Sequence, residues 1–244
     1  MRIKCKLFVV VPIVAVLLSS ASWALTPLGP PKSGLKQKQY SLGFVYASSE
    51  MDLEVGGYGF SWTATDIDWK TYLARLGYGL SDDCEIYSLL GFSKCSSDDF
   101  NGSTEFAWGF GTKFTVAKNN SVTWGGMFQL CSMSSEDSAT TEDPYFGYTS
   151  ASIDVQLFDI QIAFGPTYTK EAFSIYGGPF LHFVDGDLEV RANGDSGSVD
   201  IEQESEFGGY VGAQFDVDES ASVFIEYQMT GDASAIAGGF VWRF

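Results

Sequence analysis

The fold is decided by an alternating stretch in the middle of the chain, FAWGFGTKF at residues 106–114. Large apolar side chains stand at Phe106, Trp108, Phe110 and Phe114, and small or polar residues stand between most of them. Successive side chains of a β-strand point to opposite faces, so this period of two predicts a strand with one apolar face. An apolar face so rich in aromatic rings indicates a sheet that meets something other than water on that side.

The same alternation recurs along most of the chain, and no convincing helical stripe competes with it. One run, at 153–164, changes phase, so we expect a β-bulge near Phe158, because one extra residue moves the apolar side chains to the other face. The predicted strands contain 40–46, 72–80, 86–92, 106–114, 122–130, 153–164, 173–183, 207–215, 223–229 and 236–244. We therefore predict an all-β fold, an antiparallel up-and-down transmembrane β-barrel of about ten strands. An eight-stranded barrel and a soluble periplasmic β-sandwich are the alternatives.

The connections between these strands alternate in length. Short polar turns are expected at 81–83, 117–120, 168–171 and 216–219, and long loops at about 48–65, 95–103, 133–149 and 185–204. Short turns at one end and long loops at the other are typical of outer-membrane barrels.

The first residues have the features of an export signal. Arg2, Lys4 and Lys6 precede an apolar run at 7–18, and Ser22-Trp23-Ala24 offers the small residues that a signal peptidase reads. We predict a cleaved signal peptide at 1–24, a flexible N-terminal arm at 25–37, where three prolines interrupt any periodicity, and a barrel domain at 38–244.

The last ten residues, AIAGGFVWRF at 235–244, resemble the closing strand of bacterial outer-membrane β-barrels. In that family a terminal Phe with apolar residues at alternate positions before it is the signal that the barrel-assembly machinery reads. Phe240, Trp242 and Phe244 match this pattern, and residues 76–87 resemble a strand–turn–strand unit. Small OmpA-like and OmpW-like barrels, which usually have eight strands, are the nearest comparisons. The resemblance implies a bacterial outer-membrane location, contact with outer-membrane lipid and the assembly machinery as a partner.

The charge balance narrows the function further. With 14 basic and 31 acidic residues, a formal net charge of -17, the chain lacks the clustered cations that bind nucleic acid. We predict an integral outer-membrane barrel, expected as a monomer, with a structural or surface-interaction role, acidic outer loops and a largely closed polar lumen. A narrow channel for small solutes or cations, dependent on Glu105 or Glu226, is one alternative.

Positions between the apolar ones are expected to face the lumen, where bare charges are costly and should pair. The predicted polar network comprises Arg75, Glu85, Glu105, Lys113, Asp159, His182, Glu206, Glu226 and Arg243. Inward glycines are expected to leave room for large neighbours such as Tyr176, Phe180 and Tyr210.

Chemical motifs are weak. The single histidine, His182, is expected near the outer end of its strand, close to Asp185 and Asp187, which leaves a barrel-type outer-membrane hydrolase as an alternative. We expect no enzyme, with His182 in the lumen network instead. No C-x-x-C or calcium-loop spacing occurs, so neither a metal nor a cofactor is expected. Cys84 and Cys95 lie at opposite ends of one predicted strand, too far apart to pair.

Overall fold

The computed structural model describes residues 25–57, 60–97, 101–143, 147–192, 195–202, 206–231 and 233–244. The predicted signal peptide at 1–24 lies outside this part of the chain. Within the described residues, no helix is long and apolar enough to cross a membrane.

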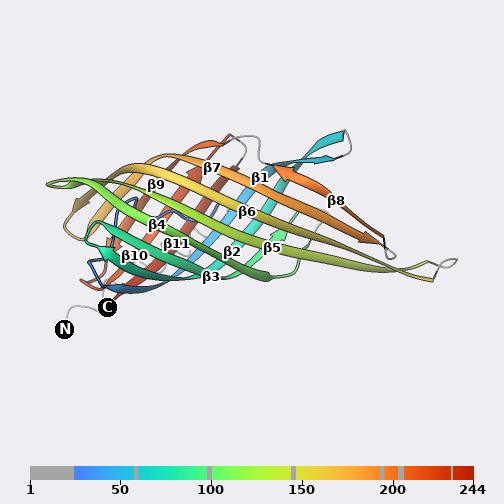
Figure 1. Ribbon diagram of the computed structural model, residues 1–244, viewed down its shortest axis with the longest axis horizontal. Helices are drawn as coiled ribbons and strands as arrows, with labels where there is room; N and C mark the ends of the chain where they lie inside the picture. Colours follow the sequence, from blue (N-terminus) through green and yellow to red (C-terminus); the bar gives the residue numbers. More distant parts are fainter. Residues whose placement is uncertain are drawn as a thin grey trace.

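Eleven antiparallel strands form one sheet, shown in Figure 1. They are β1 (Tyr40–Gly57), β2 (Phe60–Ser81), β3 (Cys84–Ser96), β4 (Glu105–Asn119), β5 (Val122–Asp143), β6 (Gly147–Lys170), β7 (Phe173–Ala192), β8 (Asp195–Glu202), β9 (Phe207–Asp216), β10 (Ala221–Met229) and β11 (Ala233–Arg243). All of them except β8 form a closed ring, because β7 pairs directly with β9 and β11 pairs back onto β1 from Ser41↔Arg243 to Met51↔Ala233. The predicted ten-stranded antiparallel barrel is confirmed, and closure excludes the β-sandwich.

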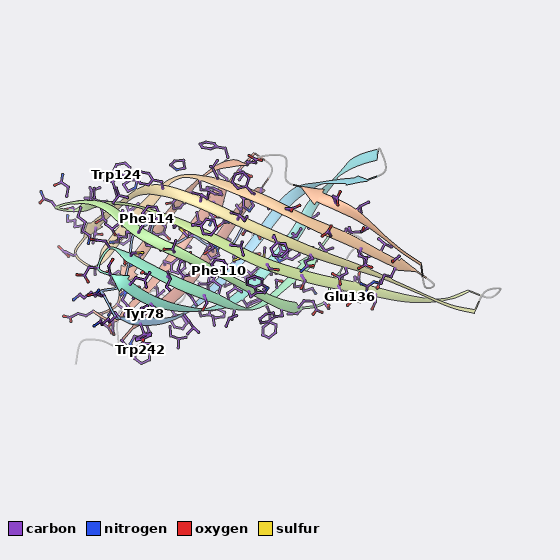
Figure 2. The ribbon with its side chains drawn as sticks, viewed as in Figure 1. Tyr78, Phe110, Phe114, Trp124, Glu136 and Trp242 are labelled. Atoms are coloured by element: carbon purple, nitrogen blue, oxygen red, sulfur yellow. The ribbon has the colours of Figure 1, made fainter. Side chains whose placement is uncertain are left out.

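The outer surface of the ring is apolar and aromatic. Tyr46, Tyr72, Phe92 and Phe106 stand directly opposite one another on four neighbouring strands, forming one aromatic row. A second group lies at the end with the short turns and the C-terminus, where Figure 2 labels Tyr78, Phe114, Trp124 and Trp242. On β1 the two groups are separated by six residues, from Tyr40 to Tyr46, or roughly 20 Å at about 3.4 Å per residue. Two aromatic girdles flanking an apolar band of this kind match a barrel that crosses a bilayer.

The opposite end projects far beyond this band as continuous hairpins rather than loops (Figure 1). The β5–β6 ladder runs to Asp143↔Gly147, and the β1–β2 ladder runs to Gly57↔Phe60. β8 pairs with β7 and also bridges to β1 above the short strands β9–β11. The long loops expected at 48–65, 133–149 and 185–204 are therefore mostly strand.

The bulge expected near Phe158 is absent, since β5 and β6 pair without a register shift from Val122↔Tyr168 to Asp143↔Gly147. The phase changes because the surroundings of the strand change. Leu157 is fully buried inside, whereas Phe158 is 40% exposed on the outer surface. Below this point apolar side chains face outward. Beyond it, Val155 and Leu157 point inward and Gln156 is exposed, so the inversion marks the edge of the apolar band.

Large side chains fill the interior of the ring. Tyr176 and Phe180, both fully buried, lie over Gly212 and Gly208, where a Cβ would collide with their rings. Glycine thus makes the space that the aromatic ring occupies, as in the small barrels whose interiors are packed with side chains.

Replacing Gly212 with alanine should therefore destabilise the barrel. The new methyl group would overlap the Tyr176 ring, and overpacking of this kind costs about 1–3 kcal/mol. Folded membrane barrels keep a shifted mobility in SDS until they are heated, and Gly212→Ala should lower the temperature of that shift. Gly197→Ala is the control, because nothing lies within 4 Å of a Cβ there. If the mobility of the two variants changed at the same temperature, the close contact between Gly212 and the Tyr176 ring would be contradicted.

Candidate functional site: a lumen occupied by residues 25–37

Most of residues 25–35 are buried inside the barrel, whereas Lys36 and Gln37 are exposed. The sequence analysis treats this segment as a flexible arm, but Leu25, Leu28 and Leu35 are all buried in the structure. Two physical causes account for the difference: burial of leucine is favourable, and Pro27, Pro30 and Pro31 have no N–H that would need a partner inside the lumen. The segment therefore enters a confined space with few unsatisfied donors.

Two carboxylates of the barrel wall hold this segment by its backbone. Glu226 accepts hydrogen bonds from the N–H groups of Leu28 and Gly29, both at 2.8 Å. Glu85 accepts one from the N–H of Gly34 at 2.7 Å and forms an ion pair with Arg75 through its other oxygen. Gly29 has φ 67°, a conformation that glycine adopts without strain. Each carboxylate therefore accepts hydrogen bonds from the N-terminal segment and holds that segment in place.

Thr26 joins the segment to the middle of the lumen. Its hydroxyl donates to Asp159 Oδ2 at 2.6 Å and accepts from Gln129 Nε2 at 2.9 Å. Its carbonyl accepts from Gln228 Nε2 at 3.0 Å. Side chains from β5, β6 and β10 therefore converge on one threonine, and sequence patterns gave no sign of it because Thr26 lies in no periodic run.

His182 lies in this same buried region. Its Nε2 is 2.9 Å from Asp159 Oδ1, and the two side chains are 0% and 1% exposed. The expectation that His182 lies near the outer end of its strand is wrong, because β7 continues for ten more residues, to Ala192. The rim position on which the hydrolase alternative depends is therefore not the position that His182 occupies.

Three further predicted lumen residues, Arg75, Lys113 and Arg243, line one cavity. Arg75 stacks on Tyr87, 4.1 Å from the ring centroid, and Lys113 is buried nearby. Arg243 lies at the short-turn end, where its Nη2 donates to Ser222 Oγ at 2.8 Å. The sequence analysis missed Tyr87, although it shares the odd-numbered, inward phase of Glu85.

Glu105 and Glu206 are not brought into this network. Glu105 accepts a hydrogen bond from Ser103 Oγ at 2.6 Å in an exposed position at the projecting end. Glu206 is exposed, and its backbone carbonyl accepts a hydrogen bond from the N–H of His182 at 2.7 Å. Glu105 is the first residue of β4 and Glu206 directly precedes β9, so both lie at the rim, where a two-residue period no longer decides which way a side chain points.

Phe240, Trp242 and Phe244 are exposed on the outer surface of the closing strand and the residue after it. Phe244 N–H donates to Tyr40 O at 3.0 Å, and its ring stacks 6.2 Å from that of Tyr40. The terminal residue thus completes the seam between β1 and β11. Its recognition by the assembly machinery stays a prediction.

Among the described residues, no group of three or more His, Cys, Asp or Glu side chains could hold a metal ion. The cysteines Cys84, Cys95 and Cys131 are free thiols.

No protein-family model matches the sequence, and no curated protein matches it. Among solved structures, the chain is similar to the translocator domain of autotransporter NalP from Neisseria meningitidis, with a TM-score of 0.47, 10% identity, and coverage of 87% of this chain and 90% of that one. It is also similar to outer membrane protease OmpT from Escherichia coli, with a TM-score of 0.47, 11% identity and coverage of 90% and 97%. A third similar structure is Ail, the attachment invasion locus protein of Yersinia pestis, with a TM-score of 0.34, 15% identity, and coverage of 85% of this chain and 99% of that one.

The closed ladder and the aromatic outer band decide the class, independently of these similarities. The chain has the fold of a bacterial outer-membrane β-barrel. Closure of the ring gives the backbone N–H and C=O groups at the strand edges hydrogen-bond partners, and such groups are costly when they are unpaired in lipid. This fold supports an outer-membrane location, and the N-terminal segment makes it a barrel with an occupied lumen.

Replacing Glu226 with glutamine should loosen the N-terminal segment. The amide keeps the size of the carboxylate but presents an NH₂ group to one of the two N–H donors, and hydrogen bonds to charged groups contribute about 1.5–3 kcal/mol. Hydrogen exchange at Leu28 and Gly29, followed by mass spectrometry, should accelerate about tenfold or more. Glu219→Gln, an exposed change at the same end, should leave it unaltered. Unchanged exchange in Glu226→Gln would show that the carboxylate does not hold the segment.

Proposed function

We propose that this protein is a closed outer-membrane barrel whose role lies at the surface, where its projecting acidic sheet binds a partner with a positively charged surface. The observation that carries this proposal is a row of three carboxylates, Glu136, Asp154 and Glu189, which stand directly opposite one another on β5, β6 and β7. Glu136 is labelled on the projecting hairpin in Figure 2. An integral barrel with a purely structural role would have no use for such a row.

Like charges directly opposite on neighbouring strands destabilise a sheet. Arg191 partly offsets this repulsion by donating two hydrogen bonds to Glu189, at 2.9 and 2.6 Å. These bonds lower the pKa of Glu189, so the carboxylate remains ionised at neutral pH. Asp185, Asp187 and Asp200 are exposed on the same sheet and add further negative charge. A cationic partner would relieve repulsion that a single arginine leaves in place.

The occupied lumen supports a role at the surface rather than conduction through the barrel. Trp69, Tyr176 and Phe180 are among the largest fully buried side chains, and Leu25 and Leu28 fill space between the walls. Several polar groups of the lumen, among them Glu85, Glu226 and Gln129, bind residues 25–37, which places this segment across the interior. The channel alternative rests chiefly on surplus lumen carboxylates, and two of these, Glu85 and Glu226, bind backbone N–H groups of the N-terminal segment.

A charged peptide tests the acidic sheet. A fluorescent decalysine peptide should bind the protein in nanodiscs at low salt, and binding should weaken as salt is added. Neutralising three acids of the sheet, with Glu136→Gln, Asp154→Asn and Asp187→Asn together, should weaken binding about tenfold. The matched control removes the same charge at the other end with Asp83→Asn, Glu171→Gln and Glu219→Gln. If both triple variants bind equally, the sheet is not the binding surface.

Planar bilayers test the closed lumen. The unaltered protein, shown to be folded by its heat-dependent mobility in SDS, should produce no ion conductance, because buried side chains occupy the interior. Stable conductance steps whose cation preference falls in Glu226→Gln would instead favour the channel alternative.

A further inference from the structure

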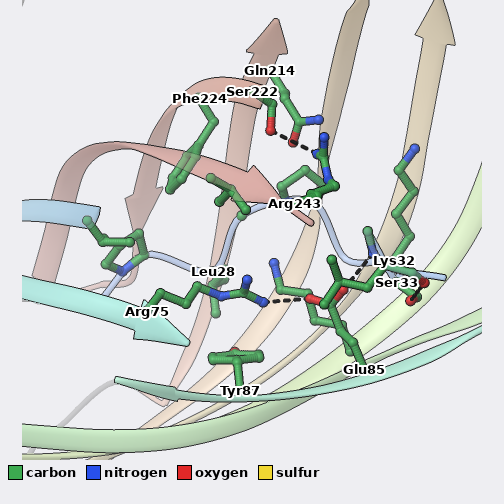
Figure 3. Close-up of a pocket in the computed structure, with 18 of the residues that line it drawn as sticks. Leu28, Lys32, Ser33, Arg75, Glu85, Tyr87, Gln214, Ser222, Phe224 and Arg243 are labelled. Carbon is green, nitrogen blue, oxygen red and sulfur yellow. Dashed lines mark hydrogen bonds and ion pairs between the residues drawn. The ribbon is translucent and has the colours of Figure 1, made fainter. Parts of the chain in front are cut away.

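A cavity of about 710 Å³ lies in the lumen at the short-turn end, between the barrel wall and residues 27–36 of the N-terminal segment (Figure 3). Its wall includes Lys36 and Glu219, which are exposed, so the cavity reaches the surface at that end. Ligand sites in proteins typically enclose roughly 300–1,000 Å³, which places this cavity in the range that holds a small molecule.

The wall of the cavity is positively charged, in contrast to the chain as a whole. Five cationic side chains line it, against three carboxylates; the cations are Lys32, Lys36, Arg75, Lys113 and Arg243. Arg75 is paired with Glu85, and Arg243 lies 3.9 Å from Asp216. The formal net charge of the whole chain is -17, so this local excess of cations is a feature of the cavity itself.

Lys113 is the most buried cation of this wall. Glu85 and Glu226 attract it electrostatically, but neither lies close enough to form an ion pair with it. Lys113 is 7% exposed and projects from β4 into the cavity, yet no hydrogen bond or ion pair is found for its ammonium group within the described part of the chain. Its Nζ would lie 2.8 Å from a Cβ placed on Gly29, which puts it against the N-terminal segment. The nearby carboxylate Glu85 is already engaged by Arg75 and the Gly34 N–H. A buried ammonium left in this state is costly unless an anion joins it.

Another part of the wall is apolar. Leu28, Leu73, Leu89 and Phe224 line the cavity, and Tyr87 contributes its ring. An inorganic anion would make no use of this surface, whereas a molecule with an acidic group and an apolar body would contact both parts.

We propose that this cavity binds a small organic carboxylate with an apolar body, its carboxylate paired with Lys113 and its body against Leu73, Leu89 and Phe224. The ligand enters from the short-turn end, which faces the periplasm in barrels with this arrangement of turns. This site is separate from the acidic sheet at the opposite end and does not depend on the partner proposed there.

Calorimetric titration of the full chain in dodecyl maltoside with 4-phenylbutyrate tests the proposal, with the titration into empty micelles subtracted. Saturable binding of one molecule per chain is expected. The uncharged analogue 4-phenylbutanamide should bind about tenfold more weakly or worse, because it cannot pair with Lys113. Acetate, which lacks the apolar body, should show no saturation over the same range. Absence of saturable binding, or equal binding of the amide or of acetate, overturns the proposal.

Two lysine variants locate the site. Lys113→Met removes the charge but keeps an unbranched side chain, and it should weaken 4-phenylbutyrate binding about tenfold or more. Lys118→Met is the matched control on the same strand, since Lys118 is exposed and paired with Asp83. Equal affinities for the two variants, each with its heat-dependent mobility intact, would show that Lys113 is not the anion contact. The comparison of the three ligands uses the unaltered chain, so it stands even if Lys113→Met fails to fold.

Discussion

The closure of β1 onto β11 is the contact on which the rest of the structure depends. In lipid an unpaired strand edge leaves a row of N–H and C=O groups without partners, so a sheet that crosses a bilayer must form a ring. Eleven residue pairs join the two strands, and Phe244 and Tyr40 exchange two further backbone hydrogen bonds. Once the ring exists, every strand has one face toward lipid and one toward a confined interior, which determines where apolar and charged side chains can lie.

The transmembrane strands could be predicted because lipid imposes one simple rule on them. From Phe106 to Phe114, the outward side chains are apolar except for Thr112 and the inward ones are small or polar, so the sequence pattern and the structure coincide. Beyond Phe158 the strand enters water and the rule inverts, with apolar residues such as Leu157 now inside. If apolar side chains are assumed to face outward along the whole strand, this inversion predicts a bulge. The same assumption predicts loops where the structure has polar strands.

The lumen could be predicted only in part, because its partners lie far apart in the chain. Arg75, Glu85, Asp159 and Glu226, which the inward phase predicts for the lumen, are buried in the structure, and each lies on a strand with a regular period. The position of residues 25–37 could not be predicted, because Leu28 binds Glu226, which is 198 positions away in the sequence. A local sequence pattern does not indicate such a contact. Charge pairing inside therefore depends on residues 25–37, which engage Glu85 and Glu226, while Lys113 forms no ion pair with any residue that the structure describes.

The position of residues 25–37 also constrains the order of events during folding. A segment enclosed by a hydrogen-bonded ring can arrive before the seam between β1 and β11 closes, or it can thread through an open mouth afterwards. The first route is direct, because Tyr40, where β1 begins, follows the segment closely in the chain. The second requires leucine side chains to pass charged groups at the rim. The enclosed segment would then exchange slowly with the outside, and its occupancy would be set by kinetics at the moment of closure rather than by equilibrium.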